Sequence, residues 1–449
     1  MSMSVLVIAN DFSAINVALS TMEKDFSTNI NTMQWVINAY ALTFGVMIVT
    51  GGRLADMFGR RRAFFLGTAI FASMSALGGA AQTEAWLIAT RVVMGLGGAL
   101  MWPAILGMTY QLLPDEKAGL AGGIILGSAG LGNAIGPLIG GAFTELLSWR
   151  WIFFLNVPVA AFAVLVTYYL VRIKEPEAGE RKIDYPGIAT LSTGLVALLV
   201  ALDQVHDWGW GDPRVIGLLV AAAVLTAVFV PIERRAGLSA LVPRAVMRNE
   251  SFRASCGAIV LMSATFFAAL LYLPLYMQDH LGYSPLEAGV GVLPFVATFA
   301  FVSFVAGPLY NRVGAKRLAV FGAACITIAP VTFSLVTESS SYGALVAGMI
   351  VLGFGIGALY PTATTAGITS VDESESSLAG GILYMCQIAG GSVGLALTTT
   401  VFSAQSSFIE GIQAAFRLDA VLALAGFLIA LFFVGGRLLR RPAGAESPT

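Results

Sequence analysis

Charged residues are scarce in this chain. Asp, Glu, Lys and Arg make up 11% of its 449 residues, against roughly 25% in soluble domains. Hydrophobic residues make up 57%, and the mean hydropathy is +0.82. This composition excludes an ordinary soluble protein and indicates an integral membrane protein. The net charge of -1 carries no information about partners, because a membrane protein distributes its charges by side of the membrane.

The chain also has few of the residues that build metal and redox sites. Its three cysteines, Cys256, Cys325 and Cys386, stand singly in apolar runs, so we expect them to act as small packing residues. The two histidines stand alone, and no metal site is predicted. The first apolar run has no basic segment before it and contains Asp11, so we do not expect a signal peptide.

Enzyme signatures are almost absent. No lysine is followed by Ser or Thr, which excludes a P-loop and therefore ATP as the energy source of this chain. Residues 390–394 fit the G-x-S-x-G pattern of a nucleophile, but they lie in a long apolar run without the strand and turn that this chemistry needs. The sequence therefore predicts no enzyme activity and no cofactor.

Long apolar runs are what the chain has in abundance. A helix that crosses a hydrocarbon core about 30 Å thick needs about 20 apolar residues. Fourteen such runs lie at 3–22, 33–51, 63–81, 86–112, 119–143, 151–172, 185–205, 214–232, 253–277, 287–310, 317–336, 342–368, 377–404 and 418–436. Most basic residues between them fall on one side, at 53–62, 172–182, 234–253, 312–317 and 437–441. The positive-inside rule places that side, and both termini, in the cytoplasm.

An internal repeat organises these runs. The segment Gly52–Arg62 (GRLADMFGRRR) returns 255 positions later as GPLYNRVGAKR, and LAGGI at 120–124 recurs at 378–382. Six helices with their loops need about 180 to 200 residues. The offset therefore leaves room for two more helices, the seventh and eighth, inserted between two six-helix halves. The predicted domains are the first half at 1–175, the inserted pair and its linkers at 176–250, the second half at 251–441, and a cytoplasmic tail at 442–449.

Two charged residues, Asp11 and Arg91, are expected to lie deep inside predicted spans. Ionisable side chains in hydrocarbon are costly and mark function. Asp11 is the only acid that we expect well inside a span. The alternative is that the first helix begins late and Asp11 lies near the surface. From a rise of ~1.5 Å per residue, we expect Asp11 and Arg91 to be separated by roughly 10 Å of height. A shared aqueous cavity would let them control proton loading. Alternatively, Arg91 pairs structurally with a backbone carbonyl or a Gln.

The first copy of the repeated loop has residues suited to a switch. Gly59 permits a tight turn, and Arg60 and Arg61 hold the loop at the anionic inner surface. Asp56 can cap a helix or pair with an arginine. Together with Gly52, these residues predict a two-state latch; the alternative is a basic loop that only sets topology.

The fifth run carries small residues on one face. Gly132, Gly136 and Gly140 are spaced four apart, with Gly141 beside them, which permits close helix packing. Pro137 cannot donate a backbone hydrogen bond and favours a kink. We predict a hinge or seal between the halves, with plain helix packing as the alternative.

These residues resemble the major facilitator superfamily and, within it, the fourteen-helix drug:proton antiporters. Residues 52–61 look like the family's loop between helices two and three, Arg91 with Gly95 and Gly97 resembles its helix-four motif, and residues 132–141 match its antiporter motif. Asp11 with residues 16–19 is similar to the helix-one motif, although Ser20 stands where Pro is usual.

The resemblance implies an all-α membrane fold of two pseudo-symmetric halves plus two inserted helices. It also implies proton-coupled efflux of amphipathic drugs or antibiotics across the bacterial cytoplasmic membrane by alternating access. We expect a monomer that binds small amphipathic substrates and protons, with no nucleic acid and no cofactor beyond the proton gradient. The candidate cavity residues are polar or aromatic positions in apolar helices: Asn38, Tyr40, Trp102, Tyr272, Tyr360, Tyr384, Met385 and Gln387.

Two other functions stay open at this point. The residues do not separate a multidrug exporter from a dedicated exporter of one endogenous metabolite. A non-transporting membrane sensor on the same fold is a further alternative, which a missing coupling acid or a damaged fifth-helix motif would favour.

Overall fold

The computed structural model describes residues 1–173 and 183–434. The predicted cytoplasmic residues at 174–182 and 437–441 and the tail at 442–449 lie outside this part of the chain. Within the described part there are 14 helices long and apolar enough to cross a membrane. The prediction of an all-α membrane fold with fourteen spans is confirmed.

The helices follow one another with short connections. The first six spans are α1 (Ser2–Phe26), α2 (Ile30–Phe58), α3 (Arg60–Gly79), α4 (Glu84–Leu112), α5 (Ala118–Leu146) and α6 (Arg150–Leu170). Two more follow as α7 (Tyr185–Trp208) and α8 (Pro213–Ala236). The rest are α9 (Arg244–Arg248), α10 (Glu250–Asp279), α11 (Pro285–Gly291), α12 (Leu293–Val313), α13 (Ala315–Phe333), α14 (Tyr342–Ile368), α15 (Ser376–Ser403) and α16 (Phe408–Phe432). Helices α11 and α12 share one span, interrupted at Val292 just before Pro294.

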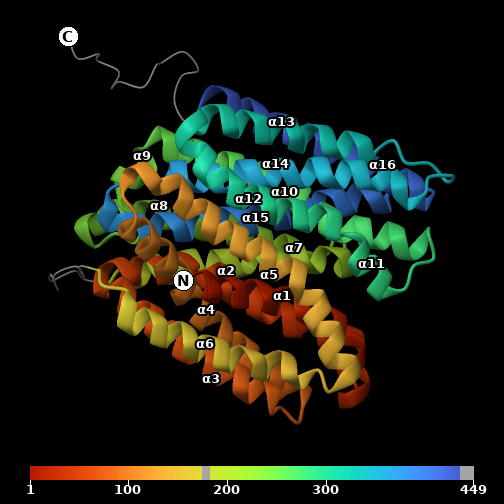
Figure 1. Ribbon diagram of the computed structural model, residues 1–449, viewed down its shortest axis with the longest axis horizontal. Coiled ribbons are helices and arrows are strands. Elements are labelled where there is room, and N and C mark those ends of the chain that lie inside the picture. Colours follow the sequence, from red (N-terminus) through yellow and green to blue (C-terminus); the bar gives the residue numbers. More distant parts are fainter. Residues whose placement is uncertain (174–182, 435–449) are drawn as a thin grey trace.

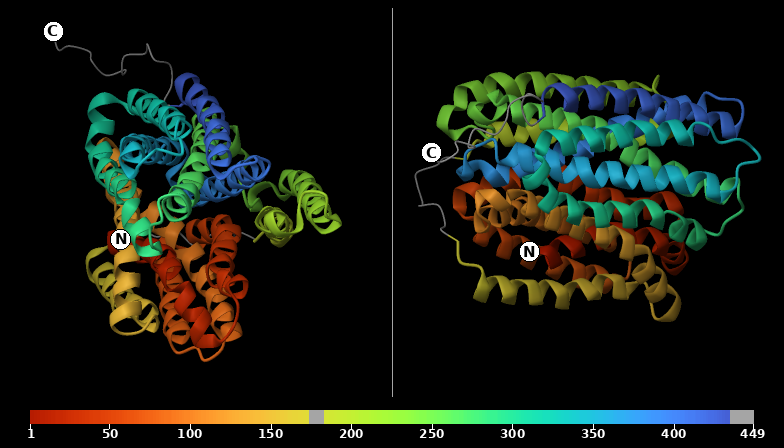
Figure 2. Two further views of the ribbon diagram at one scale, coloured as in Figure 1. Left: turned by 90° about the vertical axis from the view of Figure 1, so that its right-hand side faces the viewer. Right: turned by 45° about the horizontal axis from the view of Figure 1, so that its top comes forward.

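The helices form two bundles with a separate pair beside them (Figures 1 and 2). Within the first bundle α1 packs on α5, and α2 and α3 pack on α4; within the second, α10 packs on α15 and α16, and α14 packs on α12 and α13. The left view of Figure 2 shows α7 and α8 as a yellow-green pair at the side of both bundles. Helix α7 contacts α2 of one bundle and α15 of the other.

The two copies of the repeated loop adopt the same backbone conformation. Gly59 between α2 and α3 has a φ of 108°, and Gly314 between α12 and α13 has a φ of 91°. Both values lie in the region that residues with a Cβ avoid. The prediction that Gly59 makes a tight turn is therefore confirmed, and the turn is repeated in the second half.

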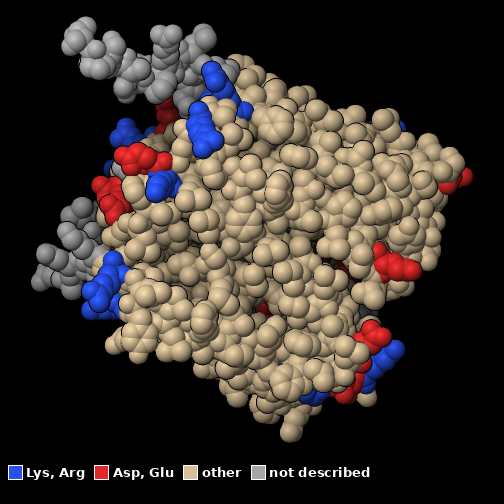
Figure 3. Space-filling model, in the orientation of Figure 1, with Lys and Arg blue, Asp and Glu red and all other residues tan. Residues whose placement is uncertain are grey.

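Charged side chains gather at the two ends of the molecule and leave an uncharged band between them (Figure 3). We call the end with α9 and the turns at Gly59 and Gly314 the basic end, and the other the opposite end. The band is what a lipid-facing surface requires, because exposed charges are costly in hydrocarbon.

The positions of three glycines in α5 show that one prediction about the boundary between the halves was wrong. A Cβ on Gly132, Gly136 or Gly140 would lie within 3 Å of α1 atoms, so these glycines pack against α1 of their own half. The contact with the other half is made nearer the start of α5, where a Cβ on Gly119 or Gly123 would meet α12 at 2.5 and 2.8 Å. The small residues that seal the halves are therefore Gly119, Gly123, Gly127 and Gly130, which lie on the face of α5 toward α12, whereas the later three lie on the face toward α1.

This packing predicts a contrast between two adjacent glycines. In Gly140→Ala the new Cβ would lie 2.2 Å from the carbonyl oxygen of Ala14, whereas in Gly141→Ala its nearest neighbour would be Leu286 at 3.6 Å. We expect Gly140→Ala to destabilise the protein by about 1–3 kcal/mol and to lower its folded yield, as overpacking does. Gly141→Ala is the matched control and should behave like the parent in thermal unfolding and in size-exclusion profiles. Equal loss in both variants would contradict the proposed role of the α1–α5 contact.

Candidate coupling and gating sites

Asp11 and Arg91 form an ion pair inside the first bundle. Oδ2 of Asp11 lies 2.5 Å from Nη1 of Arg91, and both side chains are 0% exposed. Oδ1 of Asp11 accepts a hydrogen bond of 3.0 Å from Nδ2 of Asn156 on α6. The expected roughly 10 Å of height between the two positions does not keep the side chains apart, because the long arginine side chain reaches the carboxylate of Asp11.

Arg91 has several partners besides Asp11. Its Nε donates to the carbonyl oxygen of Val36 at 2.7 Å, so the backbone pairing that we considered as an alternative is present as well. The guanidinium carbon lies 4.2 Å from the ring centroid of Tyr40, a cation–π contact. Nη2 of Arg91 has no hydrogen-bond partner. The arginine therefore relies on a single carboxylate for its countercharge in this buried site.

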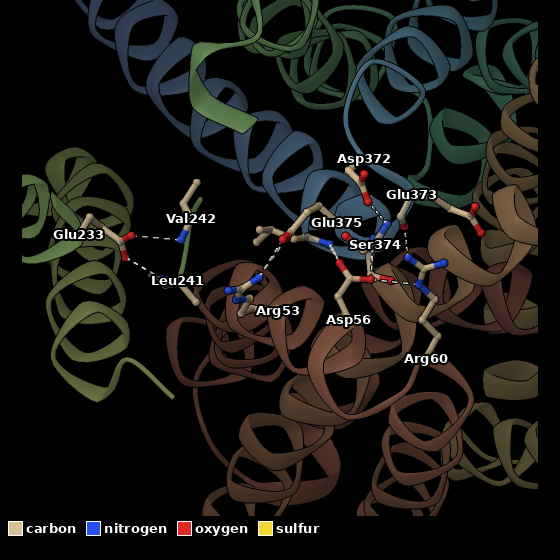
Figure 4. A network of polar contacts seen from close by, with 12 residues as sticks. Arg53, Asp56, Arg60, Glu233, Leu241, Val242, Asp372, Glu373, Ser374 and Glu375 are labelled. Carbon is tan, nitrogen blue, oxygen red and sulfur yellow. Dashed lines mark hydrogen bonds and ion pairs between the residues drawn. The ribbon is translucent and has the colours of Figure 1, made fainter. Parts of the chain in front are cut away.

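A second polar network joins the halves at the basic end (Figure 4). Asp56 accepts hydrogen bonds from Nε of Arg60 at 3.0 Å and from the backbone N–H groups of Ser377 and Leu378 at 3.2 and 2.7 Å. These N–H groups belong to the first turn of α15, where a carboxylate is favoured. Both roles considered for Asp56, helix cap and arginine partner, therefore occur together, across the boundary between the halves.

Two arginines extend this network. Nη1 of Arg53 lies 3.0 Å from Oε2 of Glu375, and Nη2 of Arg60 donates to the backbone carbonyl of Glu373. Hydrogen bonds from the side chain and backbone of Ser374 lower the pKa of Asp372, so this loop keeps its negative charge. We call Arg53, Asp56 and Arg60 with residues 372–378 the latch.

The other predicted loop residues have separate positions. A Cβ on Gly52 would lie 2.6 Å from the carbonyl oxygen of Ser377, so Gly52 allows α2 to approach α15 closely. Nη2 of Arg61 donates to the carbonyl of Tyr168 on α6 at 2.7 Å, which fastens the loop within its own half. The prediction missed Glu375; the three acids among residues 372–375, in the loop between α14 and α15, were the sequence signal for it.

Several predicted cavity residues meet where α2 and α4 face α15. The ring of Trp102 lies 4.7 Å from that of Tyr384, and the ring of Tyr40 stacks at 5.8 Å on Phe44, which contacts both Trp102 and Tyr384. We call these four residues the aromatic cluster. Phe44 was not among the predicted residues, because nothing distinguishes one Phe among 28 in the sequence.

Polar residues lie on the α14 and α15 side of the same region. Tyr360 donates a hydrogen bond to Oε1 of Gln387, and both side chains are buried. Met385 is half-buried on α15. These residues add amide, phenol and thioether groups on two helices of the second half.

Two predicted cavity residues lie elsewhere. Asn38 donates to Oδ1 of Asp203 on α7 at 3.1 Å, so it faces the inserted pair. Tyr272 donates to Oγ1 of Thr399 at 3.0 Å and packs 5.3 Å from the ring of Phe402, inside the second bundle. The structure does not bring either residue into the aromatic cluster.

Asp11 is not the only acid well inside a span. Asp419 lies in the middle of α16 and is 0% exposed. We did not predict it because we placed the start of the last apolar run at residue 418, directly after the charged Arg417. The helix begins ten residues earlier, at Phe408.

Sequence comparisons relate this chain to a known protein family. A sequence profile of the Major Facilitator Superfamily matches residues 1–299 and 255–449. The tetracenomycin C resistance and export protein of Streptomyces glaucescens is 31% identical over 396 residues, which cover 88% of this chain and 73% of that protein. The puromycin resistance protein of Streptomyces alboniger is 34% identical over 448 residues, 97% of this chain and 87% of that protein. The methylenomycin A resistance protein of Bacillus subtilis is 30% identical over 436 residues, 96% and 93%.

Solved structures agree in fold. The human organic anion transporter MFSD10 superposes with a TM-score of 0.66, covering 95% of this chain and 98% of that chain. A proton:xylose symporter superposes with a TM-score of 0.69, covering 97% and 96%. Both are 14% identical, so they speak only for the fold. The profile and the relatives show that this chain belongs to the Major Facilitator Superfamily of membrane transporters.

Proposed function

We propose that the chain exports amphipathic drugs or antibiotics from the bacterial cytoplasm by alternating access, in exchange for protons and without a cofactor. Relatives at 30 to 34% identity are named for antibiotic resistance or export, which supports the direction of transport and the class of substrate. The observation that carries proton coupling is the ion pair of Asp11 and Arg91, 0% exposed at the depth of the spans.

The proposal sets the orientation in the bacterial cytoplasmic membrane. The basic end and both termini lie in the cytoplasm, as the distribution of Lys and Arg indicates. The latch and the contact of Gly119 and Gly123 with α12 then close the cytoplasmic side. The described conformation corresponds to the stage of the cycle in which the cytoplasm has no access.

The ion pair supplies a mechanism for coupling. While Asp11 is ionised, the charge of Arg91 is balanced. A proton that arrives from outside neutralises Asp11 and leaves Arg91 as an unbalanced buried cation, a state that costs several kcal/mol. Rearrangement that hydrates Arg91 relieves this cost, and loss of the proton to the cytoplasm restores the pair. The membrane potential contributes about 2.3 kcal/mol per charge per 100 mV.

The aromatic cluster lies close enough to the pair to link substrate and proton. Tyr40 belongs to the cluster and also holds the guanidinium of Arg91 against its ring, at 4.2 Å. A flat apolar substrate that inserts among these rings would displace Tyr40 and therefore change the surroundings of Arg91. Aromatic surfaces favour amphipathic ring compounds, often cationic ones.

The test is substrate-driven proton movement in proteoliposomes that contain no nucleotide. The parent should exchange substrate for protons, and Asp11→Asn should lose pH-driven exchange while it still exchanges labelled for unlabelled substrate. Asp25→Asn is the matched control, because Asp25 forms a similar pair with Arg150 at 2.6 Å but is 43% exposed. Unchanged pH-driven exchange in Asp11→Asn would remove Asp11 from coupling.

The second candidate is a dedicated exporter of one antibiotic. It is favoured by relatives that are named as export proteins for a single compound, tetracenomycin C or cephamycin. A panel of unrelated amphipathic compounds decides between the two. Transport of one compound class alone would replace multidrug export with dedicated export.

A further inference from the structure

Asp419 on α16 is a buried acid that the proposed cycle does not use. It is 0% exposed, and neither of its carboxyl oxygens has a hydrogen-bond partner. No ion pair among the described residues includes it. An ionised carboxylate without a partner is strongly disfavoured at this depth. The side chain is therefore stable here as the neutral acid, which means that it holds a proton.

The surroundings of Asp419 contain one titratable neighbour. Tyr272 on α10 is close enough to interact electrostatically with it. The facing part of α15 presents Thr398 and Thr399, and α13 has no titratable residue from Ile326 to Phe333. The nearest charge on α16 itself, Arg417, is exposed and donates to Gln413. Because no cation faces Asp419, ionisation of Asp419 requires water or a rearranged neighbour.

Polar groups lead from Asp419 in one direction only. The phenol of Tyr272 donates to Oγ1 of Thr399 at 3.0 Å, and its oxygen can accept from the neutral acid when the two side chains come within hydrogen-bond distance. Thr399 is partly exposed, and the next residue, Thr400, is exposed and accepts from Trp210 in the turn between α7 and α8. This path leads to the opposite end.

The other direction is apolar. One turn further along α16, Ala423 lines a void of about 10 Å³ together with Ile326 and Leu359. That volume holds about one water, and an apolar wall gives a water too few partners to stay. Asp419 therefore connects to the opposite end and is closed toward the basic end.

We propose that Asp419 is a second proton-binding site, filled from the outer side through Tyr272 and Thr399. In the filling step the carboxylate takes the phenol proton of Tyr272 while the phenol regains a proton from water at Thr399. The net change is one proton from outside bound to Asp419. The proposal rests on the proton-coupled export proposed above and adds a second proton to it.

The two proposed proton sites lie at corresponding places in the two halves. In the first half, Asp11 on the first helix meets Asn156 on the sixth. In the second half, the acid is on the sixth helix, α16, and meets Tyr272 on the first, α10. Each half thus holds one acid where its first and sixth helices pack. The proton leaves when α16 shifts against α10 within the second half, because water that reaches the new gap takes the proton to the cytoplasm.

Infrared spectroscopy tests the proton itself, independently of transport. The parent in liposomes at neutral pH should show the C=O band of a buried protonated carboxyl. Asp419→Asn should lose this band, whereas Asp11→Asn and the control Glu338→Gln, which removes an exposed carboxyl, should keep it. A parent without the band, or a band that persists in Asp419→Asn, would overturn the proposal.

The pH dependence of substrate affinity tests whether this proton is part of the cycle. By linkage, the slope of log affinity against pH counts the protons exchanged, so it should fall from about two in the parent to about one in Asp419→Asn. A parent slope retained in Asp419→Asn would overturn the proposal. A zero slope in the parent would instead overturn proton-coupled export, and the infrared band would still decide the protonation of Asp419.

Discussion

Replacing Arg91 by leucine should destabilise the protein by about 3–5 kcal/mol, because the change leaves the carboxylate of Asp11 buried without its cation. Only the amide of Asn156 would still contact that carboxylate, at 3.0 Å. The apparent stability in titrations with a denaturing detergent should fall accordingly. Substrate exchange should be lost together with it.

A double variant separates stability from coupling. Asp11→Asn with Arg91→Leu removes both charges, so we expect it to recover most of the lost stability, as replacement of a whole buried pair does. It should not recover pH-driven exchange, because no group of the pair then titrates. A double variant as unstable as Arg91→Leu alone would show that Arg91 acts through its contacts with Val36 and Tyr40 and not through its charge.

Replacing Asp56 by asparagine should open the cytoplasmic side. The carboxylate receives hydrogen bonds from Arg60 and from two backbone N–H groups of α15, and hydrogen bonds to charged groups are worth about 1.5–3 kcal/mol each. Loss of the charge should therefore shift the access equilibrium by about tenfold or more. Spin labels at Phe58 and Arg312, which are exposed on opposite halves, should report a larger population of long distances.

The repeat supplies the control for this experiment. Asn311 occupies the position equivalent to Asp56 in the second copy and is exposed. Asn311→Ala should leave the distance distribution unchanged. The affinity for substrate should persist in Asp56→Asn, because the latch lies at the end of the bundle, away from the aromatic cluster. Loss of binding without a change in distances would contradict the gating role.

Local sequence signals were enough to predict the spans and their turns. The length of each apolar run predicts a membrane-spanning helix. The position of Gly59 in a repeated loop predicts a turn that only glycine adopts easily. The same signals led to Asp11, Arg91 and Asp56. Asp11 and Arg91 are charges inside predicted spans, where charge is costly, and Asp56 was identified by its place in the repeated loop.

Partners were harder to predict, because they depend on contacts between distant segments. Arg53 and Glu375 are 322 positions apart, and neither segment contains a signal that predicts contact with the other. The contact of Asp11 with Arg91 depends on the reach of the arginine side chain, which a count of residues per helix leaves out. Asp419 was missed because Arg417 looked like the end of a span, although α16 extends past it to Phe408.

Helix α5 contacts both α12 of the other half and α1 of its own half. Near its start, Gly119 and Gly123 bear on α12 of the other half; further along, Gly132, Gly136 and Gly140 hold the backbone of α1. The atoms of α1 nearest Gly132 include those of Ala9 and Asn10, immediately before Asp11. In the proposed cycle, a small tilt of α1 when Asp11 changes its charge would be transmitted through α5 to the contact with α12. Proton binding at Asp11 would then weaken the contact between the halves through a single continuous helix.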